Sequence, residues 1–211
     1  MAMLATGILL LSVALGLSYH LVLPRSKTAW RALWKVLPIV FLSVYATVQG
    51  SHPLLVLALV FAAFGDGFLA FEGERAFLRG VAAFLLCHLT YIALLVLNGG
   101  QQPWEGWTLA VVLTALAATV VVIARIRVSA GWLIGPMLAY TLVILTMLVL
   151  ATRTDARVLA GACLFVVSDL ILVVRRFWTG PEHRHDGVAA HAVWATYFFA
   201  QIMLTLGFAA A

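Results

Sequence analysis

The chain has 211 residues, of which 64% are hydrophobic and only 10% are charged. A soluble domain of this size has no core large enough to hide so much apolar surface, so the composition excludes an ordinary soluble globular protein. The net charge of +5 taken alone would allow a nucleic-acid partner. The basic residues are scattered over short connectors instead, so we expect no nucleic-acid binding and a lipid bilayer around most of the surface.

Eight apolar stretches are long enough to cross a membrane as helices, which takes about 17–25 residues each. They are expected over residues 3–23, 30–48, 53–71, 76–97, 104–124, 130–151, 157–174 and 189–209. The first stretch lacks a basic region before it and a small-residue cleavage motif after it, so we expect a retained helix rather than a cleaved signal peptide. The sequence predicts an all-α polytopic membrane protein, with a single transmembrane domain of eight transmembrane helices over residues 1–211.

Lysine and arginine predict the orientation of the helices. Eleven of the 13 basic residues fall in the connectors that follow the first, third, fifth and seventh stretches, and only Arg153 and Arg157 fall elsewhere. Cytoplasmic connectors carry the excess of such residues, so both termini are expected outside the cytoplasm. The short loops and compact length favour a bacterial cytoplasmic (inner) membrane.

Two aspartates, Asp66 and Asp169, interrupt apolar helices. A carboxylate in hydrocarbon costs several kcal/mol, so such residues usually face a bundle interior and carry function. Each lies six residues before the first charge that follows its helix, Glu72 or Arg175, which places both about 9 Å inside the cytoplasmic edge. Two carboxylates that face one cavity can divide acid and base roles. The alternative is that each pairs with a separate structural partner.

The two halves of the chain resemble each other weakly. FGDGFL around Asp66 is similar to VSDLIL around Asp169, and a histidine follows each aspartate 22 residues later, at His88 and His191. Two four-helix halves in the same orientation form a parallel repeat, with the site at their interface. The sequence therefore suggests a repeat of residues 1–100 and 104–211.

Lys35 and several polar side chains are candidates for substrate binding. Lys35 lies one turn past Arg31 and can reach a depth similar to that of the aspartates, where it could bind an anionic headgroup phosphate. Alternatively, it could extend to the interface and anchor its helix. Other polar groups need a partner inside a bundle, and convergence on one cavity would make them a site: His88, Tyr91, Tyr140, Tyr197 and Gln201.

A zinc site was the metal alternative. His183, His185 and His191 could ligate zinc together with an aspartate. The run PEHRHDG is a hydrophilic connector, however, and its histidines fit a solvated loop better. We therefore expect no metal.

Four stretches of the chain resemble the lysoplasmalogenase family of multi-spanning membrane proteins. They are FAAFGDGFLAFEGERAFLRGVAAFLLCHLTYI, GPMLAYTLVILTM, GACLFVVSDLILVVRRF and WATYFFAQIMLTLG, in the family's order. The aspartate motifs GD-x-x-L and SD-x-x-L and the H-x-x-Y of the fourth helix are specific in combination. The family usually carries an adjacent Lys-Pro pair at the start of its second helix, whereas Lys35 and Pro38 are separated here by two residues.

The resemblance implies an enzyme that hydrolyses the vinyl ether bond of lysoplasmalogens, giving a fatty aldehyde and a glycerophospho-ethanolamine or -choline. It implies Asp66 and Asp169 as the catalytic pair, the five polar residues above as site lining, and no cofactor. A lysophospholipid substrate and membrane lipids are then the expected partners, and the oligomeric state stays open. The apolar flanks of Asp169 favour it as the acid, with Asp66 ionised.

Two other function classes stay open. Midplane carboxylates in repeated halves are also typical of transporters, so a proton-coupled transporter of a small solute or lipid is the alternative. A zinc-dependent lipid amidase or related hydrolase is the third.

Overall fold

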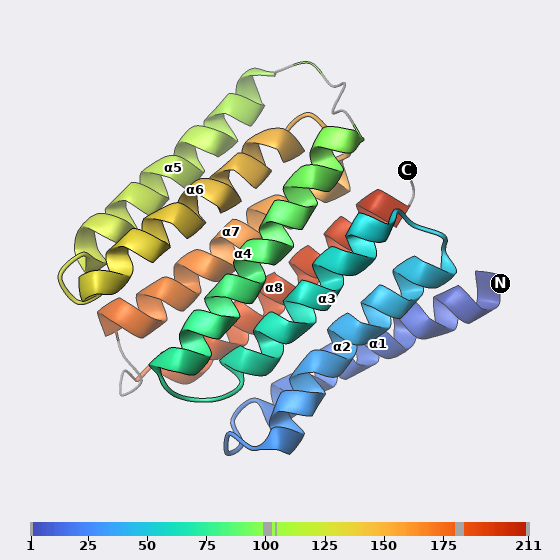
Figure 1. Cartoon of the computed structure of the whole chain (residues 1–211), viewed down its shortest axis with the longest axis horizontal. Coiled ribbons are helices and arrows are strands. Elements are labelled where there is room, and N and C mark those ends of the chain that lie inside the picture. Colours follow the sequence, from blue (N-terminus) through green and yellow to red (C-terminus); the bar gives the residue numbers. More distant parts are fainter. Residues whose placement is uncertain (1, 99–102, 104, 180–183, 210–211) are drawn as a thin grey trace. The chain divides into compact units, whose positions relative to one another are not determined.

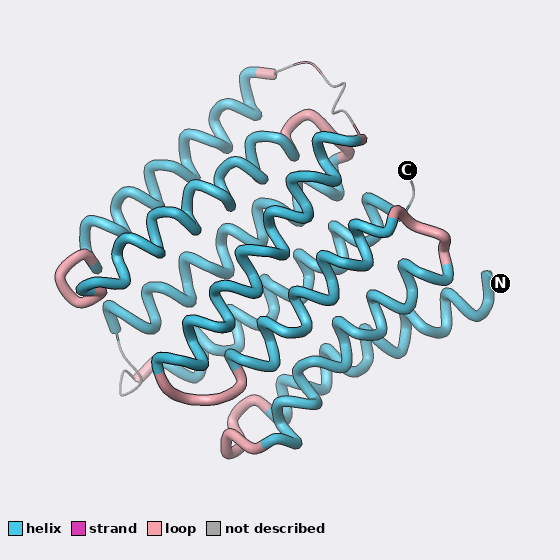
Figure 2. Tube along the Cα trace, in the orientation of Figure 1, coloured by secondary structure: helices cyan, strands magenta, loops and turns pink. Residues whose placement is uncertain are grey.

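The computed structural model describes residues 2–98, 103, 105–179 and 184–209. Over these residues the chain forms helices and short connectors without any strand (Figure 2). The helices are labelled in Figure 1. Their bounds are α1 Ala2–Val22, α2 Ala29–Val48, α3 Pro53–Leu69, α4 Glu74–Leu97, α5 Gly106–Ile126, α6 Ile134–Ala151, α7 Ala156–Val174 and α8 Asp186–Ala209. A 3₁₀ turn, Gly131–Leu133, precedes α6, and a π-helical turn, Arg175–Thr179, follows α7.

Seven of the helices in the described residues are long and apolar enough to cross a membrane. The remaining one, α3, has 17 residues and is the shortest α-helix among the described residues. Helices are the structure expected in hydrocarbon, because they satisfy their backbone hydrogen bonds internally. The chain is an integral membrane protein, and the predicted all-α polytopic class is confirmed.

Local sequence signals explain where several helices begin. The Thr28 side chain accepts a hydrogen bond from the Arg31 amide at the start of α2. Asp155 does the same for the Arg157 amide at the start of α7. Such caps satisfy amide groups that have no partner within the helix. Helix α3 starts with Pro53, whose missing N–H costs nothing in the first turn.

The chain divides into two compact units. The first unit comprises residues 1–94 with residues 205–211, and the second comprises residues 95–204. Helix α4 ends in the second unit, and the last turns of α8 belong to the first.

Small and polar residues bring the helices of the first unit together. Helix α2 packs against both α1 and α3. The Ser12 hydroxyl of α1 donates to the backbone oxygen of Pro38, at 2.7 Å, within α2. A Cβ at Gly80 of α4 would lie 2.6 Å from the Leu69 side chain of α3, so only glycine allows this approach. These contacts hold α3 close to α2 and α4.

In the second unit α7 packs against α5 and α6. Its approach to α8 depends on Gly161, where a Cβ would lie 2.7 Å from Leu204 and 3.0 Å from the backbone oxygen of Ala200. Beyond α7, Arg175 forms a bidentate ion pair with Asp186, the first residue of α8, at 2.5 and 2.8 Å. This pair joins the end of one helix to the start of the next.

Candidate functional site

Asp66 forms an ion pair with Lys35 inside the first unit. The Lys35 Nζ lies 3.0 Å from the Asp66 Oδ1, and the two side chains are 16% and 1% exposed. Lys35 comes from α2 and Asp66 from α3, two helices that pack on each other. A pair with this little exposure keeps a negative charge in an apolar setting, because the ammonium stabilises the carboxylate.

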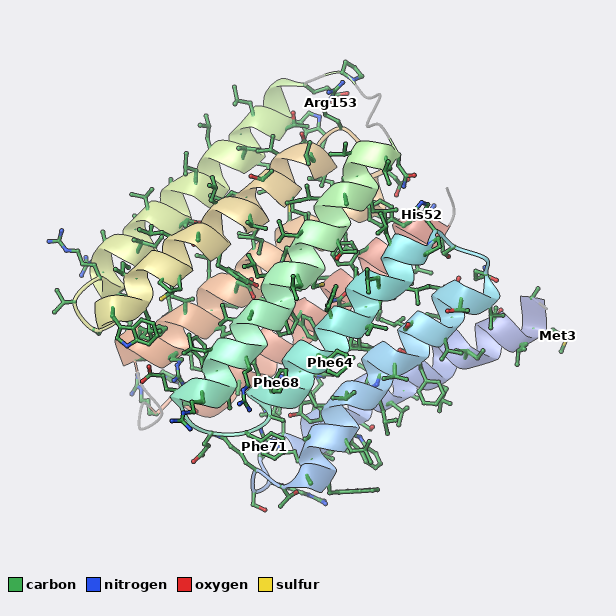
Figure 3. The ribbon with its side chains drawn as sticks, viewed as in Figure 1. Met3, His52, Phe64, Phe68, Phe71 and Arg153 are labelled. Carbon is green, nitrogen blue, oxygen red and sulfur yellow. The ribbon has the colours of Figure 1, made fainter. Side chains whose placement is uncertain are left out.

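The neighbours of Asp66 explain how the carboxylate is buried. A Cβ at Gly65 would lie 2.6 Å from the Phe84 ring of α4, and one at Gly67 would lie 3.7 Å from Val36 of α2. The glycine at position 65 therefore lets α3 approach α4 closely, whereas the distance at Gly67 is an ordinary van der Waals contact with α2. Figure 3 labels His52 just before α3 and Phe64 and Phe68 towards its other end, where Asp66 lies. Phe64 is 60% exposed while Asp66 is buried, so the carboxylate faces away from the apolar outer side of α3.

Asp169 has a different partner inside the second unit. The Tyr140 hydroxyl of α6 donates to the Asp169 Oδ2 of α7 at 2.7 Å. Among the described residues no ion pair includes Asp169. The preceding residue, Ser168, donates to the backbone oxygen of Val193 in α8 at 3.0 Å, which fixes this turn of α7. A half-buried carboxyl group with a phenol partner can hold a proton and still reach a ligand.

His88 and Tyr91 lie on α4 in the first unit, and both are fully buried. The His88 Nδ1 lies 2.6 Å from the backbone oxygen of Phe84. A carbonyl can only accept, so Nδ1 carries the proton and a neutral ring has its lone pair on Nε2. Tyr91 stacks on Phe208 of α8, with ring centroids 6.1 Å apart.

Tyr197 and Gln201 lie on α8 in the second unit, and both are buried. The Tyr197 ring contacts Phe165 of α7, with centroids 5.5 Å apart and near-perpendicular planes. Phe165 precedes Asp169 by one helical turn. Gln201 lies near Gly161 in this antiparallel register, roughly 12 Å from the Asp169 level along the helix axis.

The structure therefore forms two polar pairs from the predicted site residues. One is Lys35 with Asp66, and the other is Tyr140 with Asp169. His88, Tyr91, Tyr197 and Gln201 are buried on α4 and α8. Within their own units, the His88 Nδ1 contacts a backbone oxygen, and Tyr91 and Tyr197 contact aromatic rings. The roles assigned to these residues in catalysis and substrate binding remain predictions.

The sequence analysis missed the direct pairing of Lys35 with Asp66. Depth was the signal, because both residues were expected at a similar level, but depth does not say which way a side chain faces. Thr205 of α8 was also missed. Its hydroxyl is fully buried and has no hydrogen-bond partner within the described residues. The sequence does not predict a hydroxyl without a partner here, because threonine hydroxyls in apolar helices usually bond to their own backbone.

The zinc alternative gains no support from the described residues. His183 lies outside them, and no group of three or more His, Cys, Asp or Glu side chains within them is placed to hold a metal ion.

Known proteins resemble this chain over most of its length. Lysoplasmalogenase TMEM86B of Homo sapiens is 30% identical over 87% of this chain and 78% of its own. Lysoplasmalogenase of Mycobacterium bovis is 33% identical over 77% of this chain and 65% of its own, so the chain spans just under two thirds of that relative. Lysoplasmalogenase TMEM86B of Sus scrofa is 32% identical over 87% of this chain and 78% of its own. No solved structure matches the chain. The YhhN family matches residues 30–208, which include both aspartates and their partners, and the chain belongs to this family.

Proposed function

We propose that this protein is a membrane hydrolase that cleaves the vinyl ether bond of lysoplasmalogens. The observation that carries the proposal is the similarity to curated relatives named lysoplasmalogenase over most of the chain. The proposed products are a fatty aldehyde and a glycerophospho-ethanolamine or -choline. The proposed location is the bacterial inner membrane, with both termini outside the cytoplasm.

The chemistry needs one proton donor and one negative charge. Protonation of the β-carbon of a vinyl ether gives an oxocarbenium ion. Water adds to this ion and loses a proton, which forms a hemiacetal. The hemiacetal then collapses to the aldehyde while its former ether oxygen leaves as the alcohol of the glycerol. One water is consumed overall, and the proton given to carbon is balanced by the proton that water loses.

We assign the proton donor to Asp169 and the negative charge to Asp66. Asp169 is half-buried and accepts a hydrogen bond from an uncharged phenol, and a carboxyl group in such a setting can stay protonated and donate. Asp66 faces an ammonium at 3.0 Å, which favours the ionised form. An ionised carboxylate can stabilise an oxocarbenium ion and accept a proton from water, as in glycoside hydrolysis.

The remaining predicted residues are proposed to bind the substrate. They supply polar groups within the spans, half-buried at Tyr140 and buried at the others: His88, Tyr91, Tyr140, Tyr197 and Gln201. No metal or cofactor is needed for acid-catalysed addition of water to a vinyl ether.

Aldehyde release by the detergent-purified protein tests the proposal. A lysoplasmalogen is the substrate, and the matched lysophospholipid with a saturated alkyl ether is the control, because it has no double bond to protonate. We expect aldehyde from the first lipid alone. If well-folded protein releases none, the hydrolase proposal is wrong. Uptake driven by a pH gradient in proteoliposomes would then support the transporter alternative.

A further inference from the structure

The ammonium of Lys35 could pair with a carboxylate of the protein or with the phosphate of a lipid headgroup, and its position distinguishes the two. It lies six residues into α2, about 9 Å along the axis from the helix start. Lysines near helix ends usually extend to the interface and leave the charge in water. Here the side chain is only 16% exposed, and its ammonium contacts a carboxylate from the next helix.

The neighbouring contacts show that this pairing is built into the packing of α2 and α3. Val36 follows Lys35 in α2, and Gly67 follows Asp66 in α3. A Cβ on Gly67 would lie 3.7 Å from the Val36 side chain. The two charged residues thus lie beside a van der Waals contact between their helices. On the other side of Asp66, Gly65 fits closely against Phe84 of α4. This close fit limits movement of the backbone next to Asp66.

Burial makes each charge depend on the other. A carboxylate with 1% exposure and no cation beside it would be strongly disfavoured as an ion. It would take up a proton, and a neutral carboxyl group cannot stabilise a cationic intermediate. The charge of Lys35 is likewise compensated at 3.0 Å, so little net positive potential remains to attract a headgroup phosphate.

Other cations of the first unit lie nearer to the start of α2 than Lys35 does. Arg25 and Arg31 lie in and after the connector between α1 and α2, and the Arg31 Nη1 donates only to the backbone oxygen of Arg25, at 3.1 Å, among the contacts described. Lys27 in the same connector pairs with Glu72, but both side chains are largely exposed. A headgroup at the membrane surface would meet these cations before it met Lys35.

We propose that Lys35 is a positioning residue that keeps Asp66 charged and oriented for catalysis, and that it does not bind the substrate headgroup. The inference rests on the proposed function, since it concerns the reaction assigned to the same carboxylates.

Kinetics with two substrates separates the two roles of Lys35. The substrates are a lysoplasmalogen and the 1-alkenyl glycerol that lacks its phosphate. We expect Lys35→Met to lower kcat about 100-fold or more on both, with KM within about three-fold, because a transition-state charge is lost. Lys35→Arg restores the cation and should recover much of kcat. Arg157→Met, the loss of an exposed cation that has no part in the proposed site, should leave both constants unchanged.

Three results would overturn the inference while leaving the hydrolase in place. One is a rise in KM for the lysoplasmalogen alone, with kcat unchanged, which is the signature of a headgroup contact. Another is full kcat in Lys35→Met. The last is a Lys35→Arg variant that folds but is as inactive as Lys35→Met. Absence of aldehyde from wild-type protein instead refutes the proposed function itself, so the two failures are distinguishable.

Folding is controlled with a double variant. Lys35→Met removes the cation beside a buried carboxylate and is expected to destabilise the fold for that reason, whereas Lys35→Met with Asp66→Asn removes both charges. We expect the double variant to elute and melt like wild type while remaining inactive. A double variant less stable than either single variant would contradict the pairing. Lys35→Arg supplies the kinetic result even where Lys35→Met does not fold.

Discussion

The two aspartates look alike in sequence and differ in their surroundings. Asp66 is almost fully buried and is paired with an ammonium, whereas Asp169 is half-buried and accepts a hydrogen bond from a phenol. In each unit the partner comes from the helix before the aspartate, Lys35 on α2 and Tyr140 on α6. The partner on the preceding helix therefore distinguishes two similar motifs, since one carboxylate is provided with a counter-charge and the other is not.

This difference matches the two roles that vinyl ether hydrolysis needs. A nearby cation stabilises a group that must remain negative, and it disfavours the protonated form of a group that must carry a proton. The contrast thus provides a physical basis for assigning the charge to Asp66 and the proton to Asp169.

The largest effects are expected from removing the carboxylates themselves. Asp169→Asn should abolish proton donation and lower kcat by about 10²–10⁴-fold. It should leave the fold intact, because the amide oxygen can still accept from Tyr140. Asp66→Asn should lose activity and also about 3–5 kcal/mol of stability, because it leaves a buried ammonium unpaired. Aldehyde assays and thermal unfolding of both variants check this.

The contrast between these variants is itself testable. If Asp66→Asn melts at the wild-type temperature, Lys35 does not depend on the carboxylate. If Asp169→Asn remains fully active, that residue is not the acid, and the assignment of roles fails.

Next in size is a packing effect at Gly161, which lies on α7, the helix that carries Asp169. Gly161→Ala should cost about 1–3 kcal/mol, because the new Cβ meets backbone atoms of α8 at 3.0 Å that cannot move away easily. Gly65→Ala should cost less, since its close neighbour is the tip of the Phe84 ring. Gly135→Ala on α6 is the control, because nothing lies within 4 Å of its Cβ. Thermal unfolding ranks the three, and equal losses at all three positions would contradict the packing.

A smaller effect is expected from Tyr140→Phe. It deletes one hydrogen bond to Asp169, worth about 0.5–1.5 kcal/mol, so activity should fall by about tenfold at most. The loss should be clearly smaller than that of Lys35→Met, because a phenol only orients the acid while the ammonium maintains a charge. Steady-state kinetics of the two variants side by side makes the comparison. A larger loss in Tyr140→Phe would reverse the proposed ranking of the two partners.

The smallest effect belongs to the exposed pair of Lys27 and Glu72, at 2.8 Å. The hydrogen bond and charge of Lys27 lower the pKa of Glu72 below its ordinary value of 4.5. A lowered folded pKa contributes stability above that ordinary value, and the contribution is lost as the pH falls through the folded pKa. Thermal melts of wild type and Glu72→Gln should differ slightly at neutral pH and converge in acid. A difference that grows below pH 4.5 would contradict this sign.

Much of the fold followed from the sequence, because the length of an apolar stretch fixes where a membrane helix can lie. The expected helices agree with the observed ones to within a few residues. The third was expected to reach Phe71 and ends at Leu69, since the chain then turns through Gly73, whose φ is +100°. Pro38 was correctly kept inside a helix.

The contacts around the aspartates were harder to predict. Spacing gave the depth of Lys35 and Asp66, but their pairing also depends on how α2 and α3 are rotated about their axes, which spacing along the sequence does not give. Tyr140 was named as a candidate only among other polar residues, because nothing in a single sequence says which aspartate a tyrosine 29 positions away will reach.

The most direct test of proton transfer from Asp169 to the vinyl ether carbon is to run the reaction in D₂O and analyse the aldehyde after rapid chemical reduction. Protonation of the vinyl ether at carbon by an exchangeable acid predicts one deuterium on the carbon next to the aldehyde carbon. It also predicts that Asp169→Asn releases almost no labelled product while remaining folded. Aldehyde without deuterium, or no aldehyde from folded wild-type protein, would contradict hydrolysis by protonation at carbon.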